Sequence, residues 1–264
     1  MLALTGRAKS IIGMAHLKPL PGSPLYDRNG GMQSIIDAVA ADIAALQDGG
    51  IDAIMFGNEG DRPYVLKAAP EGLAAMAMVI ATVKPLLRVP FGADYLWDPV
   101  ATVALAATAG AAFAREVFTG VYDSDMGLWQ PDAAAALRLR ANLGAGHLRL
   151  FFNINAEFAA AVGHRDVARK AVSVVFSSLA DAVCVSGPMT GEAADASAVA
   201  RVKQAVGATP VFANTGVNRD NVAAILKYAD GAVVGTHFKR DGQTFNEVDG
   251  DRVKRFMDVV AGLH

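Results

Sequence analysis

The sequence predicts an α/β protein that folds as a single (β/α)8 TIM barrel. Eight short apolar runs alternate with segments whose apolar residues recur at helical spacing. Near-continuous apolar strands are typical of a parallel sheet that helices cover. Since no Pro/Ser-rich linker or charge block divides the chain, residues 1–264 are expected to form one domain.

The predicted strands are apolar runs rich in β-branched residues. In chain order they are residues 11–17, 53–57, 90–96, 113–118, 148–154, 182–187, 210–216 and 231–236. Helical spacing of apolar residues covers residues 35–46, 76–83, 100–107, 133–143, 199–206 and 222–226. An alternation of eight units favours a closed barrel over an open, doubly wound sheet.

Composition excludes several classes of protein. Hydrophobic residues make up 53% and aromatic residues 7%, and alanine dominates the apolar part, which favours helices packed closely on a sheet. The formal net charge of −2 attracts neither nucleic acid nor an anionic membrane. The single cysteine, Cys184, lies in an apolar run and is expected to be a buried core residue.

Targeting signals are also absent from the sequence. The N-terminal segment has no signal-peptide pattern, and no apolar stretch is long enough to span a membrane. We therefore expect a cytoplasmic protein with neither a nucleic-acid nor a membrane partner. The alanine-rich outer helices are compatible with a homo-oligomer.

The most informative stretch is residues 210–239, where two apolar runs end at Gly216 and Gly235. Barrel proteins commonly bind phosphate with the loops after strands seven and eight, and glycine lets the main chain approach phosphate oxygens. We expect a small phosphorylated metabolite to bind here, with a helix that starts near Asn218 contributing N–H groups and Lys239 contributing charge. The residues assigned to this site are Ser186, Gly187, Asn214, Gly216, Val217, Asn218, Gly235, Thr236 and Lys239.

Reactive side chains in a barrel project from the carboxyl ends of its strands. The candidates selected by that rule are His16, Glu59, Asp94, Glu116 and Asn153. Histidine titrates near neutral pH, and converging carboxylates serve as a general base or hold Mg²⁺. The sequence defines no certain cofactor, and the metal stays unknown.

Each candidate also has a structural alternative. His16 could be a packing residue, and a carboxylate could form an ion pair with Arg115. Because Arg115 and Glu116 are adjacent in a strand, they face opposite sides, so at most one enters the barrel.

Two loops, and the lack of a lysine in the predicted strands, also bear on function. The connection over residues 17–32 is rich in proline and glycine, which suits either a lid or a rigid irregular link. The loop over residues 119–127 carries Asp123 and Asp125, which either close over a ligand or cap turns. No predicted strand contains a lysine, which counts against a Schiff-base aldolase.

Several specific motifs extend in order over nearly the whole chain. They include MAHLKPLPGSP (14–24), FGNEGDRPY (56–64), LWDP (96–99), AREVFTGVYDSDMGLW (114–129), VCVSGPMTG (183–191), FANTGVNRDN (212–221) and ADGAVVGTHFKRDG (229–242). With them the chain resembles the BtpA/SgcQ family of barrel proteins. It is more similar to the SgcQ-like branch, associated with sugar metabolism, than to the branch linked to photosystem I biogenesis. The resemblance implies a TIM barrel with a phosphate-type site, but Asp94 stands where asparagine is usual, so no role carries over to it.

Three functions are compatible with the sequence. The leading hypothesis is an enzyme of sugar metabolism that acts on a phosphorylated sugar or related phospho-metabolite, by aldolase- or isomerase-type proton transfer beside a carbonyl. The second is nucleosidase-like cleavage of a ribosyl bond. The third is a non-catalytic BtpA-type assembly factor, which would be expected to have a degraded rim; the abundance of His, Asp, Glu and Asn at the strand ends favours an enzyme.

Overall fold

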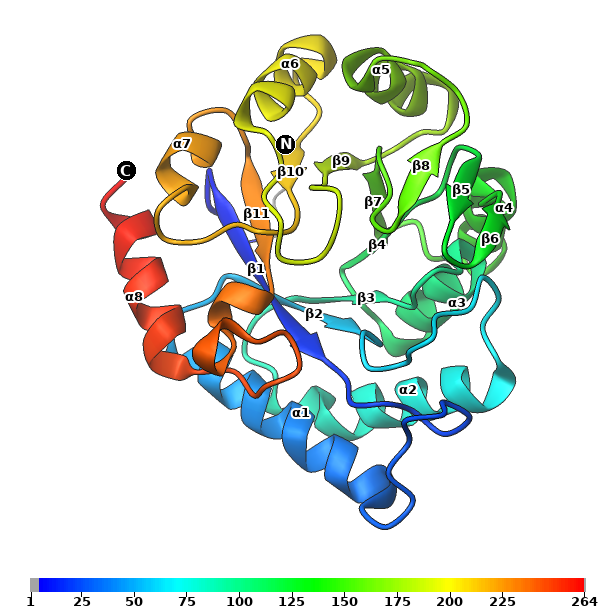
Figure 1. Ribbon diagram of the computed structural model, residues 1–264, viewed down its shortest axis with the longest axis vertical. Coiled ribbons are helices and arrows are strands. Elements are labelled where there is room, and N and C mark those ends of the chain that lie inside the picture. Colours follow the sequence, from blue (N-terminus) through cyan, green and yellow to red (C-terminus); the bar gives the residue numbers. More distant parts are fainter. Residues whose placement is uncertain (1–4, 264) are drawn as a thin grey trace.

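The computed structural model describes residues 5–263, in which eight parallel strands close into a barrel surrounded by helices (Figure 1). Around the barrel the strands lie in the order β1-β11-β10-β9-β7-β4-β3-β2, and β2 pairs with β1 to close the ring. The predicted (β/α)8 barrel is therefore confirmed. Residues 1–4 and 264 of the expected single domain lie outside the described part.

The barrel strands are short, and almost every residue in them is buried. Their bounds are β1 Ser10–His16, β2 Ala53–Gly57, β3 Phe91–Asp94, β4 Phe113–Glu116, β7 Arg149–Asn153, β9 Ala182–Val185, β10 Val211–Ala213 and β11 Gly231–Val234. The bounds of β2 match the prediction, and the other seven strands end one to three residues earlier than predicted. The residues past each strand end belong to the loops that form the site.

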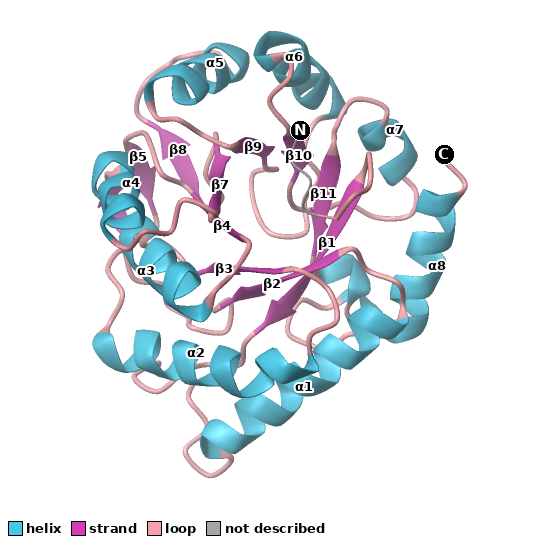
Figure 2. Ribbon diagram, turned by 180° about the vertical axis from the view of Figure 1, so that it is seen from behind, coloured by secondary structure: helices cyan, strands magenta, loops and turns pink. Residues whose placement is uncertain are grey.

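Helices form the outer ring and strands the inner one (Figure 2). The helices are α1 Gly31–Asp48, α2 Pro70–Val83, α3 Pro99–Ala109, α4 Ala133–Asn142, α5 Val167–Ser177, α6 Ala196–Val206, α7 Val222–Leu226 and α8 Gly250–Ala261. Short 3-10 segments are η1 Lys84–Leu86, η2 Thr236–Phe238 and η3 Arg240–Gly242. The helical segments predicted from sequence omit α5 and α8. Within residues 5–263, none of the helices combines the length and apolar character needed to cross a membrane.

Aspartate is the N-cap residue of several of these helices. Its carboxylate accepts hydrogen bonds from backbone N–H groups of the first helical turn, which would otherwise have no partner. These N-cap residues are Asp98, Asp132, Asp166, Asp195 and Asp249.

Alternation along the strands separates the barrel interior from the layer under the helices. The interior is an apolar cluster that consists of Ile12, Met14, Ala53, Met55, Phe113, Phe151, Ala182, Cys184, Phe212 and Val233. The expectation that Cys184 is buried is thus confirmed. Since side chains two residues apart share a face, the next inward positions form a layer at the carboxyl ends of the strands. That layer consists of His16, Gly57, Asp94, Arg115, Asn153, Ser186, Asn214 and Gly235.

A small antiparallel sheet stands outside the barrel and includes part of the segment predicted as a loop, residues 119–127. It pairs β5 Tyr122–Ser124 with β6 Gly127–Trp129 and with β8 Ala159–Ala161. Asp123 and Asp125 are exposed. This sheet buries Tyr122 and Trp129 against Trp97, so its contribution to the site is support.

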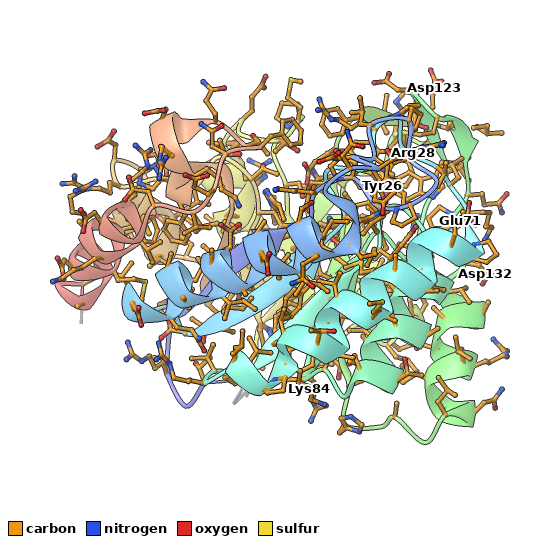
Figure 3. The ribbon with its side chains drawn as sticks, turned by 90° about the horizontal axis from the view of Figure 1, so that it is seen from below. Tyr26, Arg28, Glu71, Lys84, Asp123 and Asp132 are labelled. Atoms are coloured by element: carbon orange, nitrogen blue, oxygen red, sulfur yellow. The ribbon has the colours of Figure 1, made fainter. Side chains whose placement is uncertain are left out.

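The long first connection packs on the outside of the barrel mouth. The backbone N–H of Leu20 donates to Asp61 Oδ1 at 2.6 Å, and a side chain at Gly22 would touch Glu71 at the start of α2. Figure 3 shows Tyr26 and Arg28 at the same end of the barrel as Asp123, opposite Lys84 at the end of α2. Leu17, Lys18 and Pro19 of this connection line a cavity that also includes His16, but none of its residues lines the cavity described below, so the rigid link fits better than a lid over that site.

A buried ion pair joins the first and last units of the barrel. Lys239 Nζ donates to Asp42 Oδ2 at 2.6 Å, and the other oxygen of Asp42 accepts the backbone N–H of Val248 at 2.7 Å. Asp42 belongs to α1, whereas Lys239 and Val248 follow β11. The contact lies beside the seam where β1 pairs with β11, so it links the two ends of the fold.

Replacing Lys239 by methionine would leave the buried Asp42 carboxylate without a cationic partner. Removing one member of a buried pair costs about 3–5 kcal/mol, so we expect Lys239→Met to lower the free energy of unfolding by that order in urea denaturation. The control is the double variant Asp42→Asn/Lys239→Met, which removes both charges but keeps an acceptor for Val248. It should recover much of the loss. A single variant as stable as the wild type would contradict this role.

Candidate functional site

A cavity of about 200 Å³ opens at the carboxyl ends of the barrel strands. Its floor includes Met14, His16, Arg115 and Val233, which belong to β1, β4 and β11. Loops that follow the strands form its walls. This is the end at which barrel enzymes bind their ligands.

His16 and Glu59 lie in contact on one side of the floor. The distance from His16 Nε2 to Glu59 Oε1 is 3.3 Å, and His16 Nδ1 lies 3.4 Å from the backbone oxygen of Thr244. A side chain at Gly235 would come within 3.0 Å of His16 Cε1, so glycine at the end of β11 leaves room for the imidazole. The sequence predicted both members of this pair but not their contact.

Burial determines the protonation state of the pair. Burial, followed by the charge of Lys239, lowers the pKa of His16 to about 3. Burial, followed by the charge of Asp94, raises the pKa of Glu59 to about 8. At neutral pH the imidazole is therefore neutral, and most of Glu59 carries its proton.

The contact with Thr244 identifies the tautomer of His16. A carbonyl oxygen only accepts, so Nδ1 of His16 carries the hydrogen that faces Thr244. The Nε2 atom of the neutral imidazole is then the basic nitrogen, and it faces the Glu59 carboxyl. The pair thus combines a neutral acid with a neutral base.

Arg115 separates this pair from a second group of carboxyls. Its Nε donates to Asp94 Oδ2 at 2.9 Å, and Nη2 bonds the same oxygen. Arg115 lines the cavity, whereas Asp94 lies behind it, so the ion-pair alternative for Asp94 holds. Glu116 faces the other side of β4 and does not line the cavity; burial, followed by the charge of Asp94, raises its pKa well above the usual range.

The remaining predicted polar residues lie in the inward layer, around the floor. Asn214 Nδ2 donates to Asn153 Oδ1 at 2.7 Å and to Ser186 Oγ at 3.2 Å. The N–H of Gly187 donates to Thr215 Oγ1 at 2.7 Å. Asn153, Ser186, Gly187 and Asn214 do not line the cavity in the described structure, so their direct roles in catalysis or phosphate binding gain no support.

The loops after β10 and β11 form one wall, as predicted. Of the residues assigned to phosphate, those that line the cavity are Gly216, Val217, Asn218, Gly235 and Thr236. The wall contains no helix at Asn218, because α7 begins at Val222 and has five residues. The side-chain amides of Asn218 and Asn221 instead donate to the oxygen of Gly216, at 3.3 and 2.9 Å.

Glycine at position 216 has a structural cause that the sequence argument did not include. Its φ is +55°, in the left-handed region, and an added Cβ would lie 2.2 Å from the backbone nitrogen of Ala193. The loop after β10 therefore packs directly on the loop after β9. A substitution at Gly216 would displace both loops and would not test phosphate binding alone.

Arg252, rather than Lys239, brings positive charge to this wall. The ammonium of Lys239 is buried against Asp42 and does not line this cavity, so its predicted contribution to phosphate binding gains no support. Arg252, from the first turn of α8, does line it, and its Nε donates to the oxygen of His237 at 2.7 Å. His237 also lines the cavity, and burial, followed by the charge of Arg252, lowers its pKa. No sequence spacing relates Arg252 to β11, so tertiary structure alone identifies it.

The opposite wall consists of residues that the sequence analysis did not select. Tyr64, Trp97 and Phe158 line it, from the loops after β2, β3 and β7. Beside them, Glu157 accepts a hydrogen bond from Thr190 Oγ1 at 2.9 Å, and burial raises its pKa. Tyr64 and Trp97 belong to the quoted motifs near strand ends, whereas Glu157 and Phe158 lie in none of them.

Metal binding gains no support from this arrangement. In residues 5–263, no three His, Cys, Asp or Glu side chains are grouped so as to hold an ion. Glu59 lies against His16, Asp94 bonds Arg115, and Glu116 does not line the cavity. Asp94 interacts with Glu116 and adds to the effect of burial in raising the pKa of Glu59, but within residues 5–263 the three carboxyls do not form a common ion site.

Fold and cavity together define a (β/α)8 barrel with an acid–base pair and glycine-containing loops at its carboxyl-terminal mouth. The chain belongs to the BtpA family, whose model matches residues 7–262. It is 46% identical to the SgcQ protein of the sgc region of Escherichia coli, over 97% of this chain and 95% of that protein. It is 29% identical to the photosystem I biogenesis protein BtpA of Synechocystis sp., over 95% of this chain and 88% of that protein. The greater similarity to the SgcQ-like branch is confirmed.

Solved structures agree on the fold. Phosphoribosyl anthranilate isomerase from Thermus thermophilus superposes with a TM-score of 0.59, over 97% of this chain and all of that one. The sequence identity is 14%, so the likeness is limited to the barrel.

The pH dependence of stability tests the protonation of Glu59. An unfolded glutamate loses its proton near pH 4.5, whereas folded Glu59 keeps it to about pH 8. Between these values the folded state binds more protons, so the contribution of Glu59 to stability falls as the pH rises. The free energy of unfolding of wild type minus that of Glu59→Gln should decrease across this window, by at most about 1.4 kcal/mol per pH unit.

The neutral amide of Glu59→Gln keeps the shape of the side chain without its titration, so other groups cancel in the difference. The difference should become constant above about pH 8. A difference that stays flat from acid to alkaline pH, measured by urea denaturation, would show that Glu59 is ionised normally.

Proposed function

We propose that the chain is an enzyme of sugar metabolism that moves a proton beside the carbonyl of a phosphorylated sugar or related phospho-metabolite. One observation carries this proposal: a neutral imidazole lies in contact with a protonated carboxyl, and both face one cavity. Such a pair is able to accept one proton and donate another at neutral pH. A purely structural barrel has no need for two buried groups with opposed pKa shifts.

The proposed reaction follows from the positions of the two groups. His16 Nε2 takes the proton from the carbon next to the carbonyl, and Glu59 gives its proton to the carbonyl oxygen. The product of this step is an enediol beside an imidazolium and a carboxylate. In an isomerisation the imidazolium then protonates the neighbouring carbon, and the Glu59 carboxylate takes the proton of the second hydroxyl, so both groups return to their starting states. The Arg115 guanidinium on the floor would stabilise negative charge that develops on the oxygen.

The phosphate would lie against the wall formed by the loops after β10 and β11. The supporting observations are the backbone of Gly216, Val217 and Thr236 at the cavity surface and the Arg252 guanidinium beside it. Binding of a remote phosphate orients the reacting carbons over His16 and Glu59, which is how barrel enzymes commonly use such a group.

A panel of sugar phosphates and the corresponding free sugars tests the phosphate site. A ligand at a hundred times its dissociation constant adds about 2.7 kcal/mol of stability, or roughly 5–10 °C in melting temperature. We expect this shift with phosphorylated sugars and not with free sugars. No shift with any phosphorylated compound would sink the proposal and favour the assembly-factor alternative.

Arg252 and Arg255 form a matched pair for locating the anion. Both are on α8, but Arg252 lines the cavity and Arg255 is exposed outside it. Losing a charge-assisted hydrogen bond costs about 1.5–3 kcal/mol, so Arg252→Gln should weaken sugar-phosphate binding about tenfold or more. Arg255→Gln removes the same charge and should change the dissociation constant little. Equal losses in both variants would indicate a general charge effect.

Hydrogen exchange tests the chemistry without a known product. In heavy water, the enzyme should exchange the hydrogen beside the carbonyl of a bound sugar phosphate, and NMR detects its loss. Glu59→Gln should slow the exchange about 10²–10⁴-fold, whereas Asp123→Asn, at an exposed site, should leave it unchanged. An undiminished rate in Glu59→Gln would remove Glu59 from the mechanism.

A further inference from the structure

Three aromatic side chains form a continuous surface on one side of the cavity, which we call the aromatic wall: Tyr64, Trp97 and Phe158. The ring centroids lie 5.9 Å apart for Tyr64 and Trp97, 6.1 Å for Tyr64 and Phe158, and 6.5 Å for Trp97 and Phe158. All three residues line the cavity. Neither the pair of His16 and Glu59 nor the wall formed by the loops after β10 and β11, which we call the phosphate wall, requires such a surface.

The aromatic wall faces the phosphate wall across the mouth of the barrel. Trp97 follows β3, and in the ring of eight barrel strands β3 is opposite β10, which carries Gly216. Glu59 lies between these walls and touches the aromatic one, because the Tyr64 hydroxyl donates to the Glu59 backbone oxygen at 3.3 Å. A ligand whose phosphate is bound at the loops after β10 and β11 therefore points its other end at these rings.

Trp97 has an unused hydrogen-bond donor at the cavity. The residue is 2% exposed, and within residues 5–263 its indole Nε1 is buried without a hydrogen-bond partner. A buried N–H without a partner is unfavourable, so an acceptor supplied by a ligand would restore the bond. Trp129 packs behind the indole at a centroid distance of 5.3 Å and holds it in place.

Phe158 is held in a rare backbone conformation. Its φ is +54°, in the left-handed region that bulky residues avoid. Two hydrogen bonds hold it there: its N–H donates to the oxygen of Pro188, and its oxygen accepts from the N–H of Asp125. Such strain persists where surrounding structure holds a residue in place, often at ligand sites.

The chemistry of the aromatic wall selects the kind of group that binds it. A sugar carries a hydroxyl on nearly every carbon and needs several polar partners. Those partners, His16, Glu59, Arg115 and Glu157, line the same cavity. The aromatic wall presents apolar ring surface and one N–H donor, which suits a flat ring with an acceptor atom.

We propose that the aromatic wall is a subsite for an aromatic or heteroaromatic ring that the substrate carries at the end opposite its phosphate. This inference rests on the proposed function and makes it more specific: the substrate is a phosphorylated sugar joined to a flat ring. The ring packs on the partly exposed rings of Tyr64 and Phe158 and accepts a hydrogen bond from the indole nitrogen at the edge of Trp97. The sugar then lies over His16 and Glu59.

Trp97 itself provides the measurement, because the chain contains two tryptophans and Trp129→Phe leaves Trp97 alone. This variant is titrated with ribose 5-phosphate, adenosine, adenosine monophosphate and uridine monophosphate, and its fluorescence is followed. Base–aromatic stacking predicts that at least one ring-bearing phosphate binds about tenfold or more tightly than ribose 5-phosphate. We expect that ligand to change the Trp97 emission.

A second variant separates stacking from simple loss of folding. In a chain that keeps Trp129, Trp97→Phe retains a ring but loses the N–H. It should weaken binding of the ring-bearing ligand, measured by calorimetry, and leave binding of ribose 5-phosphate unchanged. Circular dichroism and a melting curve close to those of the wild type establish that the variant is folded.

The outcomes distinguish this inference from the phosphate proposal. If ribose 5-phosphate binds as tightly as every ring-bearing ligand, the ring subsite is overturned while phosphate binding stands. If adenosine and its monophosphate bind equally and change the Trp97 emission, the ring subsite stands and the phosphate proposal fails. If no compound binds, both fail.

Discussion

Closure of the barrel between its first and last strands is the constraint on which the other features depend. The pairing of β1 with β11 brings His16 beside Gly235, and the buried contact between Asp42 and Lys239 secures that seam from outside. Residues that are more than 200 positions apart in the chain thereby become neighbours. The cavity exists because this ring is complete and its interior is filled below by apolar side chains.

Low polarity beneath the cavity explains the chemistry at its floor. Burial disfavours charge on both His16 and Glu59, so the imidazole loses its proton and the carboxyl retains one. Arg115 keeps its charge because Asp94 lies behind it. Neutral and charged groups therefore occupy one floor, and the two walls above it differ in kind: glycine-containing backbone with Arg252 on one side, aromatic rings on the other.

Particular residues show where reading the sequence succeeded and where it could not. The rule that polar residues end barrel strands found His16 and Glu59, because strand ends are local features. The same rule selected Asn153 and Ser186, which lie around the floor and do not line the cavity. Alternation along a strand predicts which face a side chain is on, but not whether it reaches the cavity. Gly216 was selected because glycine lets a ligand approach the backbone. In the structure, however, a side chain at this position would first meet the backbone of Ala193.

The sequence by itself determined the (β/α)8 class, the order of the barrel strands along the chain and membership of the BtpA family, because apolar periodicity and motifs are properties of short segments. Tertiary structure alone decided which cation approaches the wall formed by the loops after β10 and β11: Lys239 pairs with Asp42, and Arg252 reaches the wall from α8. It also decided that Tyr64, Trp97 and Phe158 meet on one wall. Side chains from separate βα units meet only when the ring closes, and no local sequence pattern encodes the distances between them.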